Sequence, residues 1–339
     1  DLFLNSKSIL QLLNEAVPDF SAYPANLGYP YVCLQSMFVP YYQGEIRWGA
    51  EAAVKSPIKS IFLILAMWLV QVLPYQATAK EQEQSSGYLC SLTKAMIDNI
   101  GHLTASECRF LSTVFMGVLW QLSYIGGNII EASRAYGDFL QMIVKQFYPA
   151  FSQAVKPNRK LKKQGKIRIG YMSLRFRHQA VSLYMGNRMM RHDKSKFHVT
   201  CMSFTKDKDY LTKQIANSCD EFVDLTPLSD SEDFFTEMAK VIKKQKFDIL
   251  IYPDIGMDEV TFLLGAMRLA PVQVVMMGHC MTSGLSTIDY YVSGDHEPVN
   301  GQDYYVEKLI KLPNLGVCQL PPVKNVSNLT RSSIGVPDD

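Results

Sequence analysis

The sequence predicts an α/β domain built on a parallel sheet, preceded by an all-helical domain. In the first 155 residues, apolar side chains recur at helical spacing, whereas from residue 166 onward short β-branched runs alternate with helical patterns. The density of charge changes at the same place, because 20 of residues 1–155 are charged, against 46 of residues 156–339. We therefore expect a domain boundary between these two parts.

The composition is that of a folded protein with a substantial core. Hydrophobic residues make up 47% of the 339 and charged residues 19%, which argues against a disordered chain. The chain has 34 basic and 32 acidic side chains, a balance that predicts no bulk binding to nucleic acid or to acidic membranes. Seven cysteines are scattered without a CxxC pair, which favours free thiols in a reducing compartment.

The helical part contains the most apolar run of the chain, residues 61–73. This run is uncharged but shorter than the ~20 residues that cross a bilayer, so we predict a buried helix and no membrane span. The chain begins at Asp1 without a basic and then apolar leader, and we expect no signal peptide and a cytoplasmic location. Further helices are predicted over residues 104–125 and 129–147, the first starting with a capping box of Thr104 and Glu107.

A basic run separates the two parts. Residues 156–168 carry seven basic side chains and no acidic one, which is typical of a solvated linker, with a phosphate or RNA patch as the alternative. We accordingly place the helical domain at residues 1–155, the linker at residues 156–168 and the α/β domain at residues 169–325.

Strands and helices alternate in the second part. Strands are predicted over residues 166–173, 196–204, 246–255, 271–279, 288–295 and 307–313, and helices over residues 181–192, 211–218, 230–245 and 258–269. This order predicts βαβ units and a parallel sheet that is buried on both faces. Because such sheets bind ligands at the carboxyl ends of their strands, the loops that follow the strands hold the candidate site.

The loop after the first predicted strand carries Arg175, Arg177 and His178, just before a helix. Helix N-terminal amides attract negative charge, and a histidine can act as an acid–base group or bind a hydroxyl. A surface histidine without a role is the alternative. A later strand leads to Asp254 and Asp258, where Asp254 is a candidate functional carboxylate and Asp258 is equally a helix N-cap. No His or Cys stands near them at ligand spacing, so we expect no metal site.

The loop after residues 271–279 is glycine-flanked and polar. Gly278 and Gly284 allow tight turns and close approach of the backbone to a ligand, while His279, Thr282 and Ser283 supply polar groups. This pattern predicts a binding loop without naming its ligand. The sequence contains no GxGxxG fingerprint, P-loop or GxSxG elbow, which argues against ordinary dinucleotide enzymes, nucleoside triphosphatases and hydrolases.

Three strings resemble the catalytic region of glycosyltransferase family 41, the group of O-linked GlcNAc transferases and SPINDLY proteins. They read YPDIGMDE, RLAPVQVVMMGHCMTSGLSTIDYYVSGD and YYVEKLIKLPNLG. In that family a segment like RLAPIQ precedes a strand, a glycine loop GHPxTSG or GYPGTSG, a D-Y pair and EKLxxLP. The first predicted strand and its His-bearing loop also resemble the start of that region, so the resemblance covers residues 166–339.

The resemblance implies a Rossmann-like domain, the amino-terminal half of a GT-B glycosyltransferase, behind a helical region that presents protein acceptors. Family members transfer a sugar, usually GlcNAc from UDP-GlcNAc, to Ser or Thr of proteins without a metal or other cofactor. Related enzymes use UDP-glucose on Asn, or GDP-fucose. By matching motifs, His178 lines the acceptor side as the candidate catalytic residue. The candidate substrate-binding residues are Arg175, Arg177, Asp254, Gly278, His279, Thr282, Ser283 and Gly284. By the same matching, His279, Thr282, Ser283 and Gly284 lie near the donor sugar.

Two residues depart from the family pattern. Cys280 stands where Pro is common, and Arg175 where Asp is common. Residues 326–339 resemble the beginning of a second, truncated Rossmann-like domain, which normally supplies most nucleotide contacts. We therefore expect the chain alone to be inactive.

Other functions stay open at this point. The main alternative is a catalytically degenerate protein that serves as an interaction scaffold. A nucleotide-sugar epimerase is disfavoured, because the resemblance runs through the loop strings of the transferases. The expected partners are protein acceptors and a nucleotide sugar, without nucleic acid or membrane, and a homo-oligomer is one of the states that the sequence allows.

Overall fold

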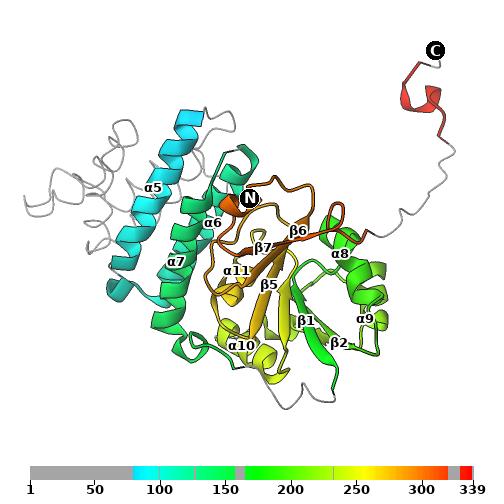
Figure 1. Cartoon of the computed structure of the whole chain (residues 1–339), viewed down its shortest axis with the longest axis horizontal. Helices are drawn as coiled ribbons and strands as arrows, with labels where there is room; N and C mark the ends of the chain where they lie inside the picture. Colours follow the sequence, from blue (N-terminus) through cyan, green and yellow to red (C-terminus); the bar gives the residue numbers. More distant parts are fainter. Residues whose placement is uncertain are drawn as a thin grey trace, which may run out of the picture.

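The computed structural model describes residues 79–98, 100–125, 127–156, 165–231, 233–319 and 329–337. Its parts are a group of helices and an α/β unit that lie side by side (Figure 1). The helix predicted over residues 61–73 lies outside the described residues. Residues 157–164 of the basic run also lie outside them.

Three long helices form the described helical part: α5 (Ala79–Asp98), α6 (Ala105–Ile125) and α7 (Ile130–Phe147). The capping box at the start of α6 is confirmed, because the Glu107 amide donates to Thr104 Oγ1 and the Thr104 amide donates to the Glu107 carboxylate. Helix α7 contacts both α5 and α6, and it also contacts a helix of the α/β unit.

The sheet has seven strands in the order β3-β2-β1-β4-β5-β6-β7, and all neighbouring pairs are parallel. The strands are β1 (Ile167–Ser173), β2 (Phe197–Ser203), β3 (Glu221–Asp224), β4 (Ile249–Tyr252), β5 (Val272–Met276), β6 (Tyr290–Gly294) and β7 (Lys308–Leu312). This order confirms the Rossmann-like fold, with β7 added at one edge. Strand β3 was not predicted, because this short edge strand contains two acidic residues and is only partly buried.

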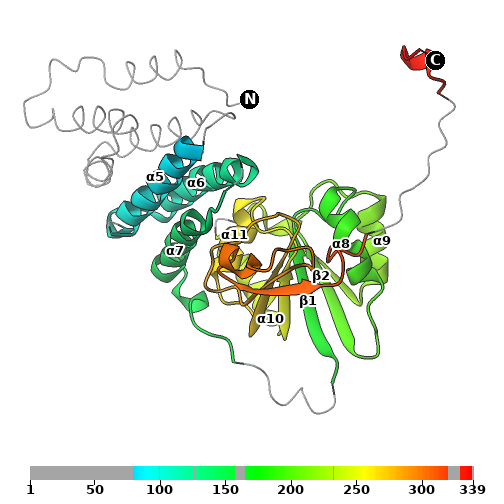
Figure 2. The same ribbon diagram turned by 45° about the horizontal axis from the view of Figure 1, so that its top comes forward.

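Helices cover both faces of the sheet (Figures 1 and 2). They are α8 (Ala180–Met190), α9 (Tyr210–Ser218), α10 (Phe234–Lys244) and α11 (Glu259–Ala266), which confirms the four predicted helices. The short 3-10 helices are η2 (Ile100–His102), η3 (Pro149–Phe151), η5 (Thr226–Leu228), η6 (Gly301–Tyr304) and η7 (Ser332–Ile334). Helices α8 and α9 lie on one face, and α10 and α11 lie on the face toward α7.

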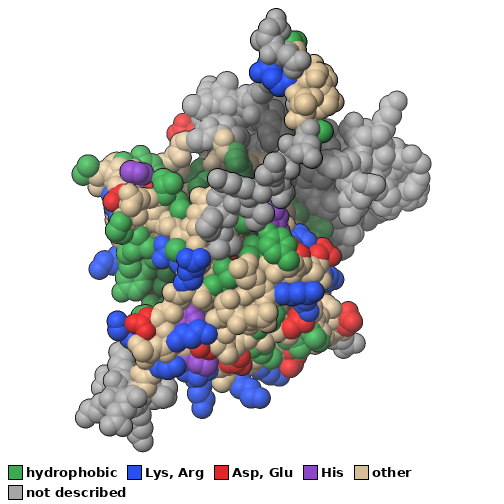
Figure 3. All heavy atoms as spheres, turned by 90° about the vertical axis from the view of Figure 1, so that its right-hand side faces the viewer, with side chains coloured by type: hydrophobic (Ala, Val, Ile, Leu, Met, Phe, Trp, Pro, Cys, Tyr) green, Lys and Arg blue, Asp and Glu red, His purple; other side chains and the backbone are tan. Residues whose placement is uncertain are grey.

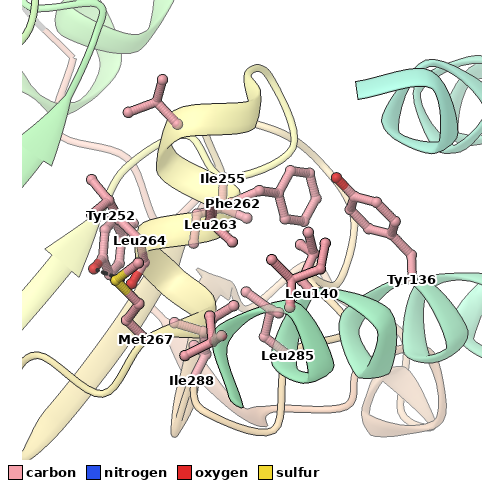
Figure 4. Packing of buried hydrophobic residues seen from close by; sticks show 14 of the residues in the cluster. Tyr136, Leu140, Tyr252, Ile255, Phe262, Leu263, Leu264, Met267, Leu285 and Ile288 are labelled. Carbon is pink, nitrogen blue, oxygen red and sulfur yellow. Dashed lines mark hydrogen bonds between the residues drawn. The ribbon is translucent and has the colours of Figure 1, made fainter. Parts of the chain in front are cut away.

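Each face of the sheet buries its own apolar cluster. Successive residues of β1 point to opposite faces, so that Tyr171 belongs to the cluster under α8 and α9, and Met172 to the larger cluster. The larger cluster continues into the helical part. Figure 4 shows Tyr136 of α7 near Phe262 of α11, and their rings meet edge to face with centroids 5.0 Å apart. One core therefore joins α7 to the sheet. The domain limits at residues 155 and 169 remain a prediction.

The surface charges, the helices and the cysteines of the described residues do not by themselves indicate a particular function. Over the right-hand face of Figure 1, Lys and Arg side chains are interspersed with Asp and Glu (Figure 3). None of the helices in the described ranges is long and apolar enough to cross a membrane. Six cysteines fall within the described residues, and all six are free thiols. In the same residues, no cluster of three His, Cys, Asp or Glu side chains is arranged to hold a metal ion.

Candidate functional site

The loops after β1, β4 and β5 meet at the carboxyl edge of the sheet, because the three strands are parallel neighbours in the order β1-β4-β5. Ser173, at the end of β1, donates a 2.8 Å hydrogen bond to Asp254 in the loop after β4. The amide of Gly278, after β5, donates to the carbonyl of Pro253 at 2.9 Å. Three of the predicted loops therefore contact one another at one edge of the sheet, as the sequence led us to expect.

A cluster of charged side chains, of which only Asp254 is fully buried, lies between the first two loops. The guanidinium of Arg175 donates to the carbonyl of Met257 at 2.7 Å, and its Nε lies 3.5 Å from Asp254 Oδ2. Its Nη2 lies 3.7 Å from Asp258 Oδ2. Arg175 thus faces two carboxylates of the protein itself, and these contacts accommodate a cation at a position where the family commonly has Asp.

The two carboxylates of this cluster differ in role. Asp258 is the N-cap of α11, and its Oδ1 accepts a 2.8 Å hydrogen bond from the Thr261 amide. Asp254 is fully buried, and its Oδ1 has no hydrogen-bond partner within the described residues. Burial, with the neighbouring charge of Asp258, raises the pKa of Asp254 to about 7, although the Ser173 hydroxyl and Arg175 act in the opposite direction. Asp254 can therefore exchange a proton near neutral pH.

Arg177 and His178 lie at the rim of the edge rather than in this cluster. Arg177 forms a 2.6 Å ion pair with Asp207, in the loop after β2. The exposed His178 donates its backbone amide to Asp209, the N-cap of α9, and its ring lies 5.4 Å from that of Tyr210. The loop after β1 is thus held by the loop after β2, and the imidazole of His178 stays accessible from solvent.

His279 is buried between the sheet and helix α6. Its ring is parallel to the indole of Trp120, with centroids 4.8 Å apart, and Gly256 lies so close to the ring that a Cβ at that position would overlap it. Burial lowers the pKa of His279 to about 4, so the ring is neutral at physiological pH. Its Nε2 is buried without a hydrogen-bond partner among the described residues, while its carbonyl accepts from Tyr291 Oη at 2.7 Å.

The rest of the loop after β5 is fixed by one buried carboxylate. Glu307, just before β7, accepts hydrogen bonds from Thr282 Oγ1 at 2.6 Å and from the Ser283 amide at 2.8 Å. The Ser283 hydroxyl also donates to Glu307. Both predicted hydroxyls are therefore engaged inside the protein, where they set the shape of the loop.

Gly284 brings this loop against helix α7. Its φ is +70°, and a Cβ at this position would overlap the carbonyl oxygen of Ser133. A Cβ on Gly137, the facing residue of α7, would overlap the carbonyl of Gly284 in turn. The loop and the helix thus approach each other through two glycines, and only residues without a side chain fit there.

The family model of Glycosyl transferase family 41 matches residues 139–317, just over half of the chain, including all three loops. The chain belongs to this family. The family 41 match begins within α7, after the residues that pack on Gly284, and ends after β7, so it takes in the whole sheet and the last part of α7.

Curated relatives carry matching names. The chain is 29% identical over 226 residues to the probable UDP-N-acetylglucosamine–peptide N-acetylglucosaminyltransferase SEC of Arabidopsis thaliana, across 62% of this chain and 22% of that protein. It is 26% identical over 201 residues to the probable enzyme of the same kind named SPINDLY in Solanum lycopersicum, across 57% of this chain and 20% of that protein. The chain thus spans about a fifth of the length of these relatives.

A solved structure supports the same fold. A mutant of the Thermobaculum terrenum O-GlcNAc transferase is similar with a TM-score of 0.53 at 19% identity, over 89% of this chain and 61% of that one. At this level of identity the similarity shows the fold, and the roles of individual family 41 residues in this chain stay predictions.

Two residues that shape the site were not singled out from the sequence. Trp120 lies on a helix whose aromatic residues are indistinguishable from core filling until the helix is seen to pack on the loop after β5. Glu307 is the acidic residue of the EKLIKLP string, and its burial beside two hydroxyls follows only from the pairing of β6 with β7. The position of a carboxylate directly before a strand was the one feature of the sequence that could have indicated a structural role for Glu307.

Proposed function

We propose that this chain forms the first catalytic lobe and the acceptor-facing helices of a protein O-GlcNAc transferase. The enzyme would transfer GlcNAc from UDP-GlcNAc to Ser or Thr of proteins, with inversion and without a metal or other cofactor. The observation that carries the proposal is that the family 41 match runs through the loops after β1, β4 and β5, which the parallel sheet gathers at one edge. The names of the curated relatives support GlcNAc and a peptide acceptor.

The reaction requires the protein to position the acceptor hydroxyl and the donor sugar, and it needs no covalent intermediate with the protein. In an inverting transfer, the acceptor oxygen attacks the anomeric carbon as the bond to the diphosphate breaks, and UDP leaves with the electron pair. The hydroxyl proton passes to a base, and fixed donors stabilise the leaving diphosphate. His178 is an exposed histidine in the loop after β1, so we assign it to orient the acceptor hydroxyl and to accept its proton.

The loop after β5 would act as a rigid wall beside the donor sugar. Its hydroxyls are held by Glu307, its imidazole by Trp120, and its Gly284 by helix α7. His279, Thr282 and Ser283 are therefore assigned as positioning residues, which fix the backbone that faces the sugar. We further propose that the enzyme acts on cytoplasmic proteins.

The test is sugar transfer by the full-length protein that contains this sequence. The protein is incubated with cell-extract proteins and radiolabelled UDP-GlcNAc, and in parallel with UDP-glucose and GDP-fucose. We expect label from UDP-GlcNAc on Ser or Thr of the acceptors. His178→Ala should lower kcat/KM at least ~10²-fold, the scale of acid–base catalysis.

A matched control is available on β2. His198 lies at the amino end of that strand, at the opposite edge of the sheet, so His198→Ala should leave kcat/KM unchanged. Absence of label from all three donors would overturn the proposed function. Equal turnover by the His178→Ala and wild-type proteins would remove His178 from the reaction.

A further inference from the structure

Two aromatic rings from different segments meet beside the loop after β1. The imidazole of His178 lies with its centroid 5.4 Å from that of the Tyr210 ring, and the two ring planes are tilted by 41°. Tyr210 is the first residue of α9, the helix that follows β2. Both residues are exposed, Tyr210 to 54%. The pair therefore lies at the surface, and its geometry depends on how the two backbones are held.

The first turn of α9 holds the backbone of the loop after β1. Asp209, the N-cap of α9, accepts the His178 amide at 2.6 Å through Oδ2, while its Oδ1 accepts the Thr212 amide at 3.0 Å. Thr212 Oγ1 donates to the carbonyl of Phe176 at 2.6 Å. One carboxylate and one hydroxyl therefore tie this loop to the start of the helix, and they hold the backbone of His178 beside that of Tyr210.

The side chain of His178 is held differently from its backbone. Within the described residues neither of its ring nitrogens makes a hydrogen bond. The contrast is His192, whose two ring nitrogens bond the Met189 carbonyl at 2.9 Å and Asp220 at 2.8 Å. An exposed imidazole without such bonds can turn between rotamers. The ring of Tyr210 is its aromatic partner in the described part of the chain, and it favours one of these orientations.

We propose that Tyr210 is a positioning residue for His178, whose imidazole it holds in the orientation that accepts the proton of the acceptor hydroxyl. The inference rests on the proposed function, because that function assigns His178 as the base. Aromatic pairs prefer tilted or offset arrangements with centroids about 4.5–7 Å apart, and the observed pair has this geometry. Since a base must lie within hydrogen-bond reach of the proton that it accepts, an imidazole that leaves this orientation is unproductive.

The proposed role needs the ring of Tyr210 and not its hydroxyl. Among the described residues the hydroxyl makes no hydrogen bond, so phenylalanine should replace tyrosine without loss. Leucine instead keeps an apolar side chain but removes the ring. Neither substitution changes the bonds by which Asp209 and Thr212 hold the loop. Tyr210→Phe and Tyr210→Leu therefore separate the ring contact from the hydroxyl and from the backbone of the loop.

The contact is measured first, by NMR of the full-length protein that contains this sequence, with ¹³C-labelled histidine rings. The signal of His178 is the one that is absent from His178→Ala. A neighbouring aromatic ring shifts the ring protons of a histidine by its ring current. Tyr210→Leu should therefore move the His178 signal, whereas Tyr210→Phe should leave it near the wild-type position. An identical His178 signal in Tyr210→Leu and in the wild type would overturn the proposal.

Single-turnover transfer from UDP-GlcNAc measures the consequence. Tyr210→Leu should lower the maximal rate constant at least ~5-fold, which corresponds to about 1 kcal/mol and is the size of an aromatic pair. The acceptor concentration that gives half of the maximal rate should not change, because the imidazole is misplaced while the acceptor still binds. Tyr210→Phe should keep the wild-type rate. A higher half-maximal concentration with an unchanged maximal rate would overturn the proposal, since it would make Tyr210 a contact of the acceptor itself.

Two further variants test whether Tyr210 acts through His178. Tyr184→Leu is the matched control, because this exposed tyrosine of α8 has no ring partner within the described residues, and it should change neither the His178 signal nor transfer. In a double-mutant cycle, Tyr210→Leu should add no loss to His178→Ala, whose imidazole is already gone. A further loss of at least 5-fold in the double variant, roughly the effect of Tyr210→Leu alone, would contradict the positioning role.

The two measurements separate this inference from the proposed function. Transfer by the wild type at the same rate as by Tyr210→Leu would overturn the positioning role and leave the proposed function standing. A His178 signal that moves in Tyr210→Leu, without transfer from any of the tested donors by the wild type, would overturn the proposed function. The ring contact would then be real, but it would position no base.

Discussion

The indole of Trp120 lies parallel to the imidazole of His279, with an interplanar angle of 5°. Trp120 belongs to helix α6, whereas His279 belongs to the loop after β5, so the stack joins the helical part to the candidate site. Tyr124, one turn further along α6, is 64% exposed and lies 6.2 Å from the same imidazole. Helix α6 thus contributes to the candidate site, because Trp120 shields His279 from water.

Replacing Trp120 with Ala should expose His279. Because burial is the cause of its low pKa, we expect the pKa to rise from about 4 toward 6.5. The lost packing should also lower the free energy of unfolding by about 2–3 kcal/mol. Titration of the histidine ring signals by NMR measures the pKa, with Trp120→Phe as the control that keeps a stacked ring. An unchanged pKa in Trp120→Ala would contradict this account of His279.

The same shift changes how stability depends on pH. With a folded pKa below the unfolded one, the native state binds fewer protons, so stability is lost as pH falls from about 6.5 through 4. In Trp120→Ala this loss should be smaller. Urea unfolding at pH 7 and pH 5 measures it.

Most of the described fold was predictable from local patterns. The apolar run that forms β1 and the cap at Asp258 are local signals, which is why their elements were found within a few residues. Strand β3 was missed, because an edge strand with a charged residue at each end lacks the apolar run that marks a buried strand.

The candidate site was predictable only in part. That the loops share an edge follows from the parallel topology, which the alternation of strands and helices indicates. That Arg175 pairs with Asp254 and that Trp120 covers His279 depends on tertiary packing between distant segments, for which a single sequence carries no spacing signal. The sequence therefore identified the polar residues of the site, but it did not show which of them are buried and which are exposed.

Gly284→Ala should be strongly destabilising. The new methyl group would overlap the Ser133 carbonyl, and the positive φ adds backbone strain, so we expect a loss of about 2–3 kcal/mol in the free energy of unfolding. Gly87→Ala is the control, since it lies in helix α5 with open space around it and should raise stability slightly. Urea denaturation compares the two. A loss below 0.5 kcal/mol, roughly the size of an ordinary surface change, would mean that α7 and the loop can separate freely.

Glu307→Gln should loosen the loop after β5. One oxygen of the carboxylate becomes an amide that cannot accept from Ser283 or Thr282, which leaves a buried donor unpaired and costs about 1–3 kcal/mol. Hydrogen exchange at the Ser283 amide should be faster in Glu307→Gln than in the wild-type protein, because the amide loses a firmly held acceptor. The control is Glu237→Gln, which removes an exposed pair with Lys240 and should cost under about 0.5 kcal/mol. Unchanged exchange at Ser283 would show that the loop is held by other contacts.

Asp254→Asn should make the protein less sensitive to rising pH. Burial raises the pKa of Asp254 to about 7, so between pH 4 and 7 the native state holds a proton that the unfolded state has released. Stability from this group is therefore full below about pH 4 and is lost as pH rises through 7. Asn is neutral throughout and can still accept from Ser173, so the variant should gain in relative stability between pH 5 and pH 8. Urea unfolding of both proteins at the two pH values measures the gain, and Asp193→Asn, at an exposed carboxylate whose pKa lies low, should show none. A difference between variant and wild type that stays constant with pH would mean that Asp254 remains ionised beside Arg175 across the whole range.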